Sequence, residues 1–221
     1  MCAAETRHLD MVKTLITAKC DVHPKDKHGR NAIVYAATEG SLDVVKCLIA
    51  AGCDAQAVDA LGKTPVMYAA EAKHVDVLKY LIQSGCDVNT KDGNGKATGM
   101  YAVESGQLDV VECLMEAGCD LNATDGLGRT PAMAAAEKGY VDIVKFLVKA
   151  GCDVHARDNG GKTPVMFAAA EGHLDVVKSL VEEARCDVHE RDEEGKTPAM
   201  HATEKGHVFV VKYLNKASAQ R

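Results

Sequence analysis

The chain has 221 residues, of which 47% are hydrophobic, and its 32 acidic residues outnumber 26 basic ones to give a net charge of −6. This acidic balance argues against a nucleic-acid partner, because phosphate binding depends on clustered Lys and Arg. No apolar run reaches the roughly 18 residues that a membrane-spanning helix needs, and the N-terminus, MCAAETRHLD, lacks the layout of a secretory signal. We therefore expect a protein that does not insert into membranes.

A repeat runs through the whole chain. Aspartates open its copies and stand 33 residues apart until the last pair, which is 34 apart: Asp26, Asp59, Asp92, Asp125, Asp158 and Asp192. Such a period predicts a stacked array, in which each repeat buries its apolar face only against its neighbours. We expect one domain, 1–221, made of a partial repeat 1–25, repeats 26–58, 59–91, 92–124, 125–157 and 158–191, and a C-terminal cap 192–221.

The partial first repeat begins in the middle of the pattern. Met1 falls on the repeat position held later by Met67, Met100, Met133, Met166 and Met200. This register favours a chain that is an excised piece of a longer array. The alternative is a chain that simply begins with half a repeat.

The repeat 59–91 shows how one copy is expected to fold. Thr64 is a predicted helix N-cap and Pro65 suits the first helical position, where its missing N–H costs nothing. The pattern predicts a first helix over about 65–72 and a second over about 75–84, with Leu78, Leu81 and Ile82 in the core and Gly85 as the stop.

Departures from the pattern are expected to weaken particular repeats. In 92–124, Ala97-Thr98-Gly99 replaces Thr-Pro-Val, so a cap worth about 1 kcal/mol is lost and we predict the softest internal repeat there. In the repeat 26–58, Asn31 stands where most repeats have the capping threonine, but an asparagine side chain can still cap the helix. Lys73 stands where most repeats have glycine between their helices, and one extra residue in 181–186 predicts a bulge or an added turn.

The repeated pattern resembles that of ankyrin repeats. Residues 130–135 (TPAMAA) and 163–168 (TPVMFA) are similar to the family's Thr-Pro-Leu-His-x-Ala signature, with methionine in place of histidine, and GHLDVV at 172–177 and GCDV at 151–154 match it too. The resemblance covers the whole chain. It implies an all-α ankyrin-repeat solenoid of helix-turn-helix units joined by β-turn or hairpin loops.

The nine cysteines do not predict disulfides or a metal site. Six share one repeat position and would stack about 8–10 Å apart, too far for a disulfide or a shared zinc ion: Cys20, Cys53, Cys86, Cys119, Cys152 and Cys186. An odd number of thiols without a secretory signal indicates a reducing compartment, which we take as the cytoplasm with the nucleus as an alternative. We interpret the column as small buried hydrophobes.

Catalysis is not expected, and neither a cofactor nor a metal is predicted. Seven of the nine histidines fall on two repeat positions, which indicates a scaffold role: His8, His74, His173 and His207, then His23, His155 and His189. No Ser-His-Asp grouping, HExxH motif or phosphate-binding glycine loop is present.

Variation at equivalent repeat positions points to binding residues, because the fold does not dictate these differences. One such position on the first helix holds Tyr35, Tyr68, Tyr101, Ala134, Phe167 and His201. The resemblance implies that it faces a concave groove, where exposed Tyr and Phe would be interface anchors and Ala134 could leave a pocket. The alternative is that these rings pack against neighbouring first helices. Beside this row each full repeat carries a glutamate: Glu39, Glu71, Glu104, Glu137, Glu171 and Glu204.

The turns supply the second set of predicted contacts. One turn position is basic in every full repeat: Arg30, Lys63, Lys96, Arg129, Lys162 and Lys196. These side chains would form either a cationic edge that orients a charged peptide or only a solvated edge. Leu61 and Leu127 are apolar at turn tips where folding does not require it, so we expect them to contact a partner. The resemblance also makes Asn89 and Asn122 candidates for hydroxylation by a 2-oxoglutarate dioxygenase.

From these features we expect a monomeric, non-catalytic scaffold that binds a protein or peptide partner reversibly through the first-helix surface and the turn tips. The alternative is a regulatory or targeting segment of a longer enzyme or channel. A designed array is disfavoured, because a designer would have removed the irregularities at 97–99 and 181–186.

Overall fold

The computed structural model describes residues 2–219, so the expectation about Met1 lies outside the described residues. The regular secondary structure of this part of the chain is α-helical, apart from one isolated β-bridge between Lys91 and Ala97. The expected all-α class is confirmed. The helices are α1 (Cys2–Glu5), α2 (Leu9–Thr17), α3 (Ala32–Thr38), α4 (Leu42–Ala50), α5 (Pro65–Glu71), α6 (Val75–Gln83), α7 (Thr98–Ser105), α8 (Leu108–Glu116), α9 (Pro131–Lys138), α10 (Val141–Lys149), α11 (Pro164–Ala170), α12 (Leu174–Glu182), α13 (Pro198–Glu204) and α14 (Val208–Ser218).

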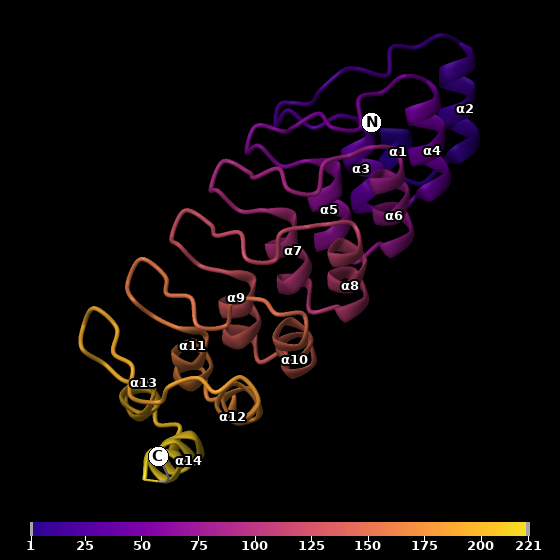
Figure 1. Ribbon diagram of the computed structural model, residues 1–221. Coiled ribbons are helices and arrows are strands. Elements are labelled where there is room, and N and C mark those ends of the chain that lie inside the picture. The colour runs from indigo at the N-terminus through magenta and orange to yellow at the C-terminus, as the bar shows by residue number, and fades with distance from the viewer. Residues whose placement is uncertain (1, 220–221) are drawn as a thin grey trace. The chain divides into compact units, whose positions relative to one another are not determined.

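The helices belong to two compact units, an N-terminal unit of residues 1–120 and a C-terminal unit of residues 121–221. In the N-terminal unit the first helices α3, α5 and α7 pack side by side, and the second helices α4, α6 and α8 form a parallel row (Figure 1). In the C-terminal unit α9, α11 and α13 form one row, and α10, α12 and α14 form the other. The boundary falls within the repeat 92–124, and the expectation of a single domain stays a prediction.

The helix boundaries in the repeat 59–91 follow from its caps, as expected. Thr64 Oγ1 accepts from the Met67 backbone N–H at 3.4 Å, and Pro65 opens the helix. Met67 returns only a weak 3.5 Å contact from its sulfur to the Thr64 N–H, where a stronger acceptor would complete a capping box. Gly85 ends the second helix with φ +84°, while Lys73 adopts φ +68°, a conformation that favours glycine.

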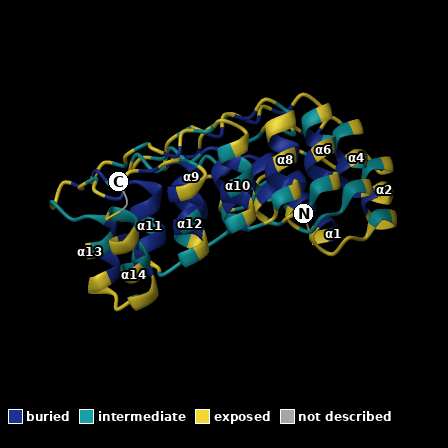
Figure 2. Ribbon diagram, turned by 60° about the horizontal axis from the view of Figure 1, so that its bottom comes forward, coloured by how far each residue is buried: buried dark blue, intermediate teal, exposed yellow. Residues whose placement is uncertain are grey.

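The core lies between neighbouring helices of each unit (Figure 2). Met67, Leu78 and Leu81 are fully buried, and burying such a side chain stabilises the fold by about 1.5–3 kcal/mol. The expectation for Ile82 was too strong, because its side chain remains partly exposed.

The predicted irregular positions are visible in the structure. Ala97 makes no side-chain cap for α7, and the Thr98 hydroxyl is buried without a hydrogen-bond partner among the described residues. Asn31 does cap α3, with Oδ1 accepting from Val34 N at 3.1 Å. The extra residue near 181–186 does not lengthen α12. It produces a bulge in which Arg185 takes φ +61° and Cys186 N bonds Leu180 O at 3.0 Å. The softness of 92–124 itself stays a prediction.

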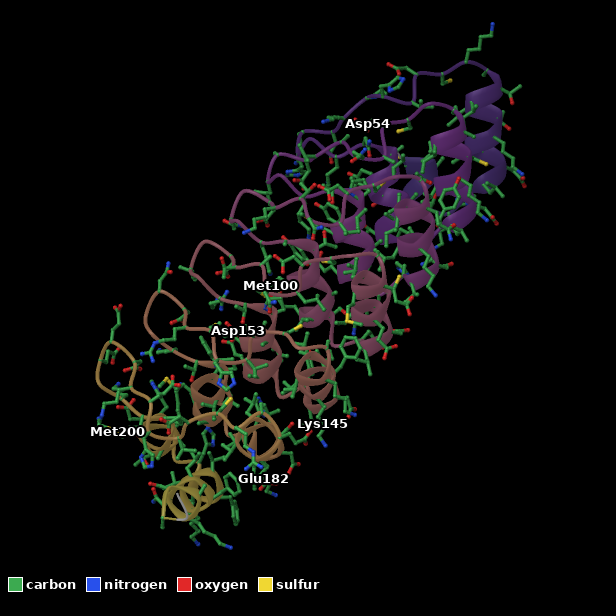
Figure 3. The ribbon with its side chains drawn as sticks, in the orientation of Figure 1. Asp54, Met100, Lys145, Asp153, Glu182 and Met200 are labelled. Atoms are coloured by element: carbon green, nitrogen blue, oxygen red, sulfur yellow. The ribbon has the colours of Figure 1, made fainter. Side chains whose placement is uncertain are left out.

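The last repeat exposes a methionine that the internal repeats bury. Met100 on α7 is 2% exposed, whereas Met200 at the equivalent position on α13 is 46% exposed (Figure 3). Phe209, the second residue of α14, stands where the second helices of the other repeats have an aspartate, and it is also exposed.

The periodic cysteines and histidines tie repeats together. Cys53 Sγ donates to Val22 O at 3.2 Å and Cys86 Sγ to Ala55 O at 3.5 Å. The burial expected of the column holds for Cys53, Cys86, Cys119 and Cys186, but Cys152 is half-buried and Cys20 is exposed.

Three histidines at one repeat position donate from Nε2 to a backbone carbonyl of the preceding repeat. His74 bonds Thr38 O at 3.0 Å, His173 bonds Glu137 O at 2.9 Å and His207 bonds Ala170 O at 3.0 Å. These links satisfy carbonyls near the ends of first helices, and the scaffold interpretation of these three side chains is confirmed.

Candidate functional site

The turn of each full repeat is organised by its opening aspartate. Asp59 Oδ1 accepts from the backbone N–H groups of Leu61 and Lys63, both at 2.8 Å. Its second oxygen accepts from the Tyr68 hydroxyl at 2.6 Å. One carboxylate therefore shapes the turn and also fastens it to the first helix.

The same link recurs wherever the first-helix position holds a hydrogen-bond donor. Tyr35 bonds Asp26 at 2.7 Å and Tyr101 bonds Asp92 at 2.6 Å. In the last repeat the donor is a ring nitrogen instead, because His201 Nε2 lies 2.7 Å from Asp192 Oδ2. These contacts give the row a structural role in the fold.

The turn cations of the N-terminal unit lie against the tyrosine rings. Lys63 Nζ is 4.2 Å from the ring centre of Tyr68 and 4.4 Å from that of Tyr101. It also forms a 2.6 Å ion pair with Glu71. Lys96 repeats the arrangement with Tyr101 at 4.5 Å and Glu104 at 2.5 Å. Such cation–π contacts contribute about 0.5–2 kcal/mol each.

These contacts correct two expectations from the sequence. The first-helix row is not an exposed aromatic surface, because Tyr101 is 6% exposed, His201 8% and Ala134 9%, and Tyr35, Tyr68 and Phe167 are half-buried. The rings contact turn aspartates and turn lysines, and their packing against neighbouring first helices stays a prediction. The turn cations do not form an open cationic edge either, since Lys63 is 8% exposed and the Glu row neutralises Lys63, Lys96 and Lys196.

Several groups in the hydrogen-bonded pairs have shifted pKa values. Burial acts to raise the pKa of Asp92, but the hydrogen bonds from Tyr101 and from the Lys96 N–H outweigh it and hold that pKa below its usual value. Burial, followed by the hydrogen bond to Asp92, raises the pKa of Tyr101. Burial and the bond to Asp59 likewise raise the pKa of Tyr68. At neutral pH the charged Asp92 carboxylate therefore accepts from a protonated Tyr101 hydroxyl, and a hydrogen bond to a charged acceptor is the stronger kind.

The C-terminal unit keeps only part of this network. Arg129 bonds Asp125 at 3.1 Å and lies 3.8 Å from Glu137, but Ala134 brings no ring. In the repeat 158–191, Phe167 has no hydroxyl for Asp158, and the Thr163 hydroxyl is buried without a hydrogen-bond partner among the described residues. The repeat 158–191 therefore lacks both the bond from the first-helix ring to its aspartate and the threonine cap that the repeat 59–91 makes.

Two of the exposed apolar side chains lie at turn tips. Leu61 is 64% exposed and Leu127 is 59% exposed. Their backbones are fully engaged, since Leu61 O accepts from Gly93 N at 2.7 Å and Leu127 O accepts from Asn159 N at 3.0 Å. The fold uses the main chain at these tips and leaves the side chains available.

Val58 joins this group, although the sequence reasoning missed it. It is 42% exposed, directly before the turn that holds Leu61. The signal was present, because the equivalent positions hold polar residues: Lys25, Lys91, Thr124, Arg157 and Arg191.

The two candidate hydroxylation sites lie on exposed loops. Asn89 Oδ1 accepts from Asp120 N at 2.8 Å, and Asn89 Nδ2 donates to Gly118 O at 3.2 Å. Asn122 Oδ1 accepts from Asp153 N at 2.8 Å. Each amide thus links its loop to the next, and modification of either residue stays a prediction.

Within residues 2–219, no group of three His, Cys, Asp or Glu side chains is placed to hold a metal ion. No helix in that range is long and apolar enough to cross a bilayer.

Comparison with known families agrees with this architecture. The family model for ankyrin repeats (3 copies) matches residues 1–92 and again residues 99–192. The interruption between the two matches contains Ala97 and Thr98, where the capping Thr-Pro pair is lost. A search of curated proteins found no matching sequence. Ankyrin repeats are generally protein–protein interaction modules and are typically non-catalytic. The matches cover most of the chain, which therefore belongs to the ankyrin-repeat family.

Proposed function

We propose that this chain is a non-catalytic scaffold that binds a protein or peptide partner reversibly, with the turn tips as the main contacts. The observation that supports this is the exposure of Leu61 and Leu127 at tips whose backbone bonds are already satisfied. Exposed apolar side chains on a rigid support lose little entropy on binding, and they gain burial energy there.

The first-helix row has a supporting role in this proposal. Tyr68 and Tyr101 hold the turns in place through Asp59 and Asp92, so the tips are pre-organised before a partner arrives. Direct contacts of the row with the partner are limited to the half-buried rings, Tyr35, Tyr68 and Phe167. A reducing compartment such as the cytoplasm, and a monomeric state, remain our predictions.

The proposal is tested by comparative capture from a lysate of the native host. Wild type and Leu61→Ser/Leu127→Ser would be immobilised at equal density and the bound proteins quantified by mass spectrometry. We expect the double variant to lose the partners that wild type retains. Met115→Ser is the matched control, because it removes an exposed apolar side chain from α8, away from the turns. Equal capture by wild type and the double variant contradicts the proposal.

A further inference from the structure

The turn of the repeat 59–91 is more apolar than its equivalents. Val58, Ala60 and Leu61 form what we call the apolar tip, with Val58 42% and Leu61 64% exposed. At the position of Leu61 the other full repeats hold His28, Asn94, Leu127, Gly160 and Glu194. The fold accepts polar residues at these places, so it does not require the apolar tip.

Cationic side chains lie beside the apolar tip. Ala60 N donates to His28 O at 2.8 Å, which places the turn 26–30 next to it. Lys25 Nζ donates to Val58 O at 3.0 Å, so its ammonium group lies at the edge of the tip. Lys27 is exposed and forms no ion pair among the described residues.

No carboxylate among the described residues forms an ion pair with Lys25 or Lys27, and this includes Asp54, which lines a depression together with Lys25. Asp26 is bonded to Arg30 at 2.8 Å and to Tyr35 at 2.7 Å. Asp59 is occupied by its own turn and by Tyr68. The ammonium groups of Lys25 and Lys27 therefore keep their charge available to a ligand.

A shallow depression of about 460 Å³ adjoins the tip, and its lining includes Lys25, Asp54, Gln56 and Val58. Asp54 lies on the loop after α4 (Figure 3), and its carboxylate accepts from the Gln56 N–H at 2.9 Å. The depression thus joins apolar and polar surface at Val58, one member of the apolar tip.

The turns of the C-terminal unit lack this combination of charge. There Arg157 is paired with Glu190 at 3.2 Å, and the last turn exposes Glu193 and Glu194. In that unit the turn next to Leu127 holds Asn159 and Gly160, which carry no charge. The apolar side chain and the available cations coincide in the N-terminal unit.

We propose that the apolar tip, together with Lys25 and Lys27, binds an acidic peptide segment that carries an apolar side chain. The leucine and valine bury the apolar side chain, and the two ammonium groups attract the flanking carboxylates. The net charge of −6 does not prevent this, since charges beyond about 8–10 Å are screened at physiological salt. This inference rests on the proposed use of turn tips and adds the chemistry of the partner.

The test is a selection of random twelve-residue peptides displayed on phage against the full chain. We expect the enriched peptides to contain several Asp or Glu around a Leu, Ile or Phe. One enriched peptide would be synthesised with a fluorescein label, and its affinity for wild type measured by fluorescence anisotropy. We expect Lys27→Glu and Leu61→Ser each to weaken binding by about fivefold to tenfold or more, and added salt to weaken binding to wild type.

Lys149→Glu is the matched control for charge reversal, because it changes the net charge equally on an exposed residue of α10 in the other unit. We expect it to leave the affinity unchanged. Circular dichroism of each variant would show that the fold is retained.

The outcomes separate this inference from the proposed function. Neutral or basic peptides that lose affinity for Leu61→Ser contradict the acidic partner but agree with binding by turn tips. Peptides that bind Leu61→Ser/Leu127→Ser as well as wild type contradict both. A selection that enriches no peptide contradicts the inference, while the comparative capture of native partners still tests the proposed function.

Discussion

The hydroxyl of Tyr101 lies 2.6 Å from the carboxylate of Asp92, nine residues earlier in the chain. Because Asp92 also accepts from the backbone N–H groups of Asn94 and Lys96, both at 2.8 Å, this one side chain joins the turn to α7. A position that the repeat pattern marks as variable thus holds the scaffold together in this repeat.

Removing the Tyr101 hydroxyl is expected to destabilise the N-terminal unit. Tyr101→Phe keeps the ring between Lys63 and Lys96 but leaves one oxygen of Asp92 without its donor. Because the lost bond has a charged acceptor, we expect the free energy of unfolding to fall by about 1.5–3 kcal/mol. Urea denaturation at pH 7 measures this. The converse change, Phe167→Tyr, supplies a donor for Asp158 and should not destabilise; equal stability of wild type and Tyr101→Phe would contradict the structural role.

The same bonds predict a loss of stability at alkaline pH. The folded pKa values of Tyr68 and Tyr101 are raised above the unfolded value of about 10. Their contribution is therefore fully present below pH 10 and is lost as pH rises from there toward the folded values. We expect the free energy of unfolding of wild type to fall more steeply between pH 9.5 and 11.5 than that of Tyr68→Phe/Tyr101→Phe. Parallel curves would show that the phenols are not coupled to folding.

Restoring the missing helix cap should stabilise the repeat 92–124. Ala97→Thr supplies a hydroxyl that can accept from the Met100 N–H, as Thr64 and Thr130 do for their helices. We expect a gain of about 1 kcal/mol. Amide hydrogen exchange followed by mass spectrometry should show the lowest protection of any internal repeat at 92–124 in wild type, and higher protection there in the variant. Uniform protection across 26–157 in wild type would refute the prediction that this repeat is softest.

The thiols are expected to react in two groups. Cys2 and Cys20 are exposed, whereas burial raises the pKa of both Cys86 and Cys119 to about 11. Because the thiolate is the reactive form, iodoacetamide at pH 7.5 should label Cys2 and Cys20 quickly and leave Cys86 and Cys119 unmodified until the chain unfolds. Peptide mapping after timed alkylation measures this. Rapid labelling of Cys86 in the folded protein would contradict the buried column.

Much of the fold could be read from the sequence, because the signals are local and repeated. Thr64 and Pro65 mark a helix start by their own chemistry, and the spacing of the opening aspartates predicts stacking. Even the bulge at Arg185 could be located, since one added residue must be accommodated near the end of α12.

The burial of the first-helix row could not be read in this way. A tyrosine is compatible with an exposed anchor or a buried donor, and the choice depends on whether the preceding turn brings its aspartate back to the ring. The sequence contained an indirect signal, because Tyr35, Tyr68 and Tyr101 each follow an aspartate by nine residues. The exposure of Leu61 and Leu127 was easier to anticipate, since turn tips lie at the surface whatever their side chains.

The central claim is that the turn tips bind the partner while the first-helix row holds the fold. The most direct test is isothermal titration calorimetry of the captured partner with wild type, Leu61→Ser/Leu127→Ser and Tyr68→Phe/Tyr101→Phe, at a temperature where all three are folded. We predict that the leucine variant loses at least about tenfold in affinity with unchanged stability, and that the tyrosine variant loses stability but keeps most of its affinity. A leucine variant that binds as tightly as wild type would contradict the account.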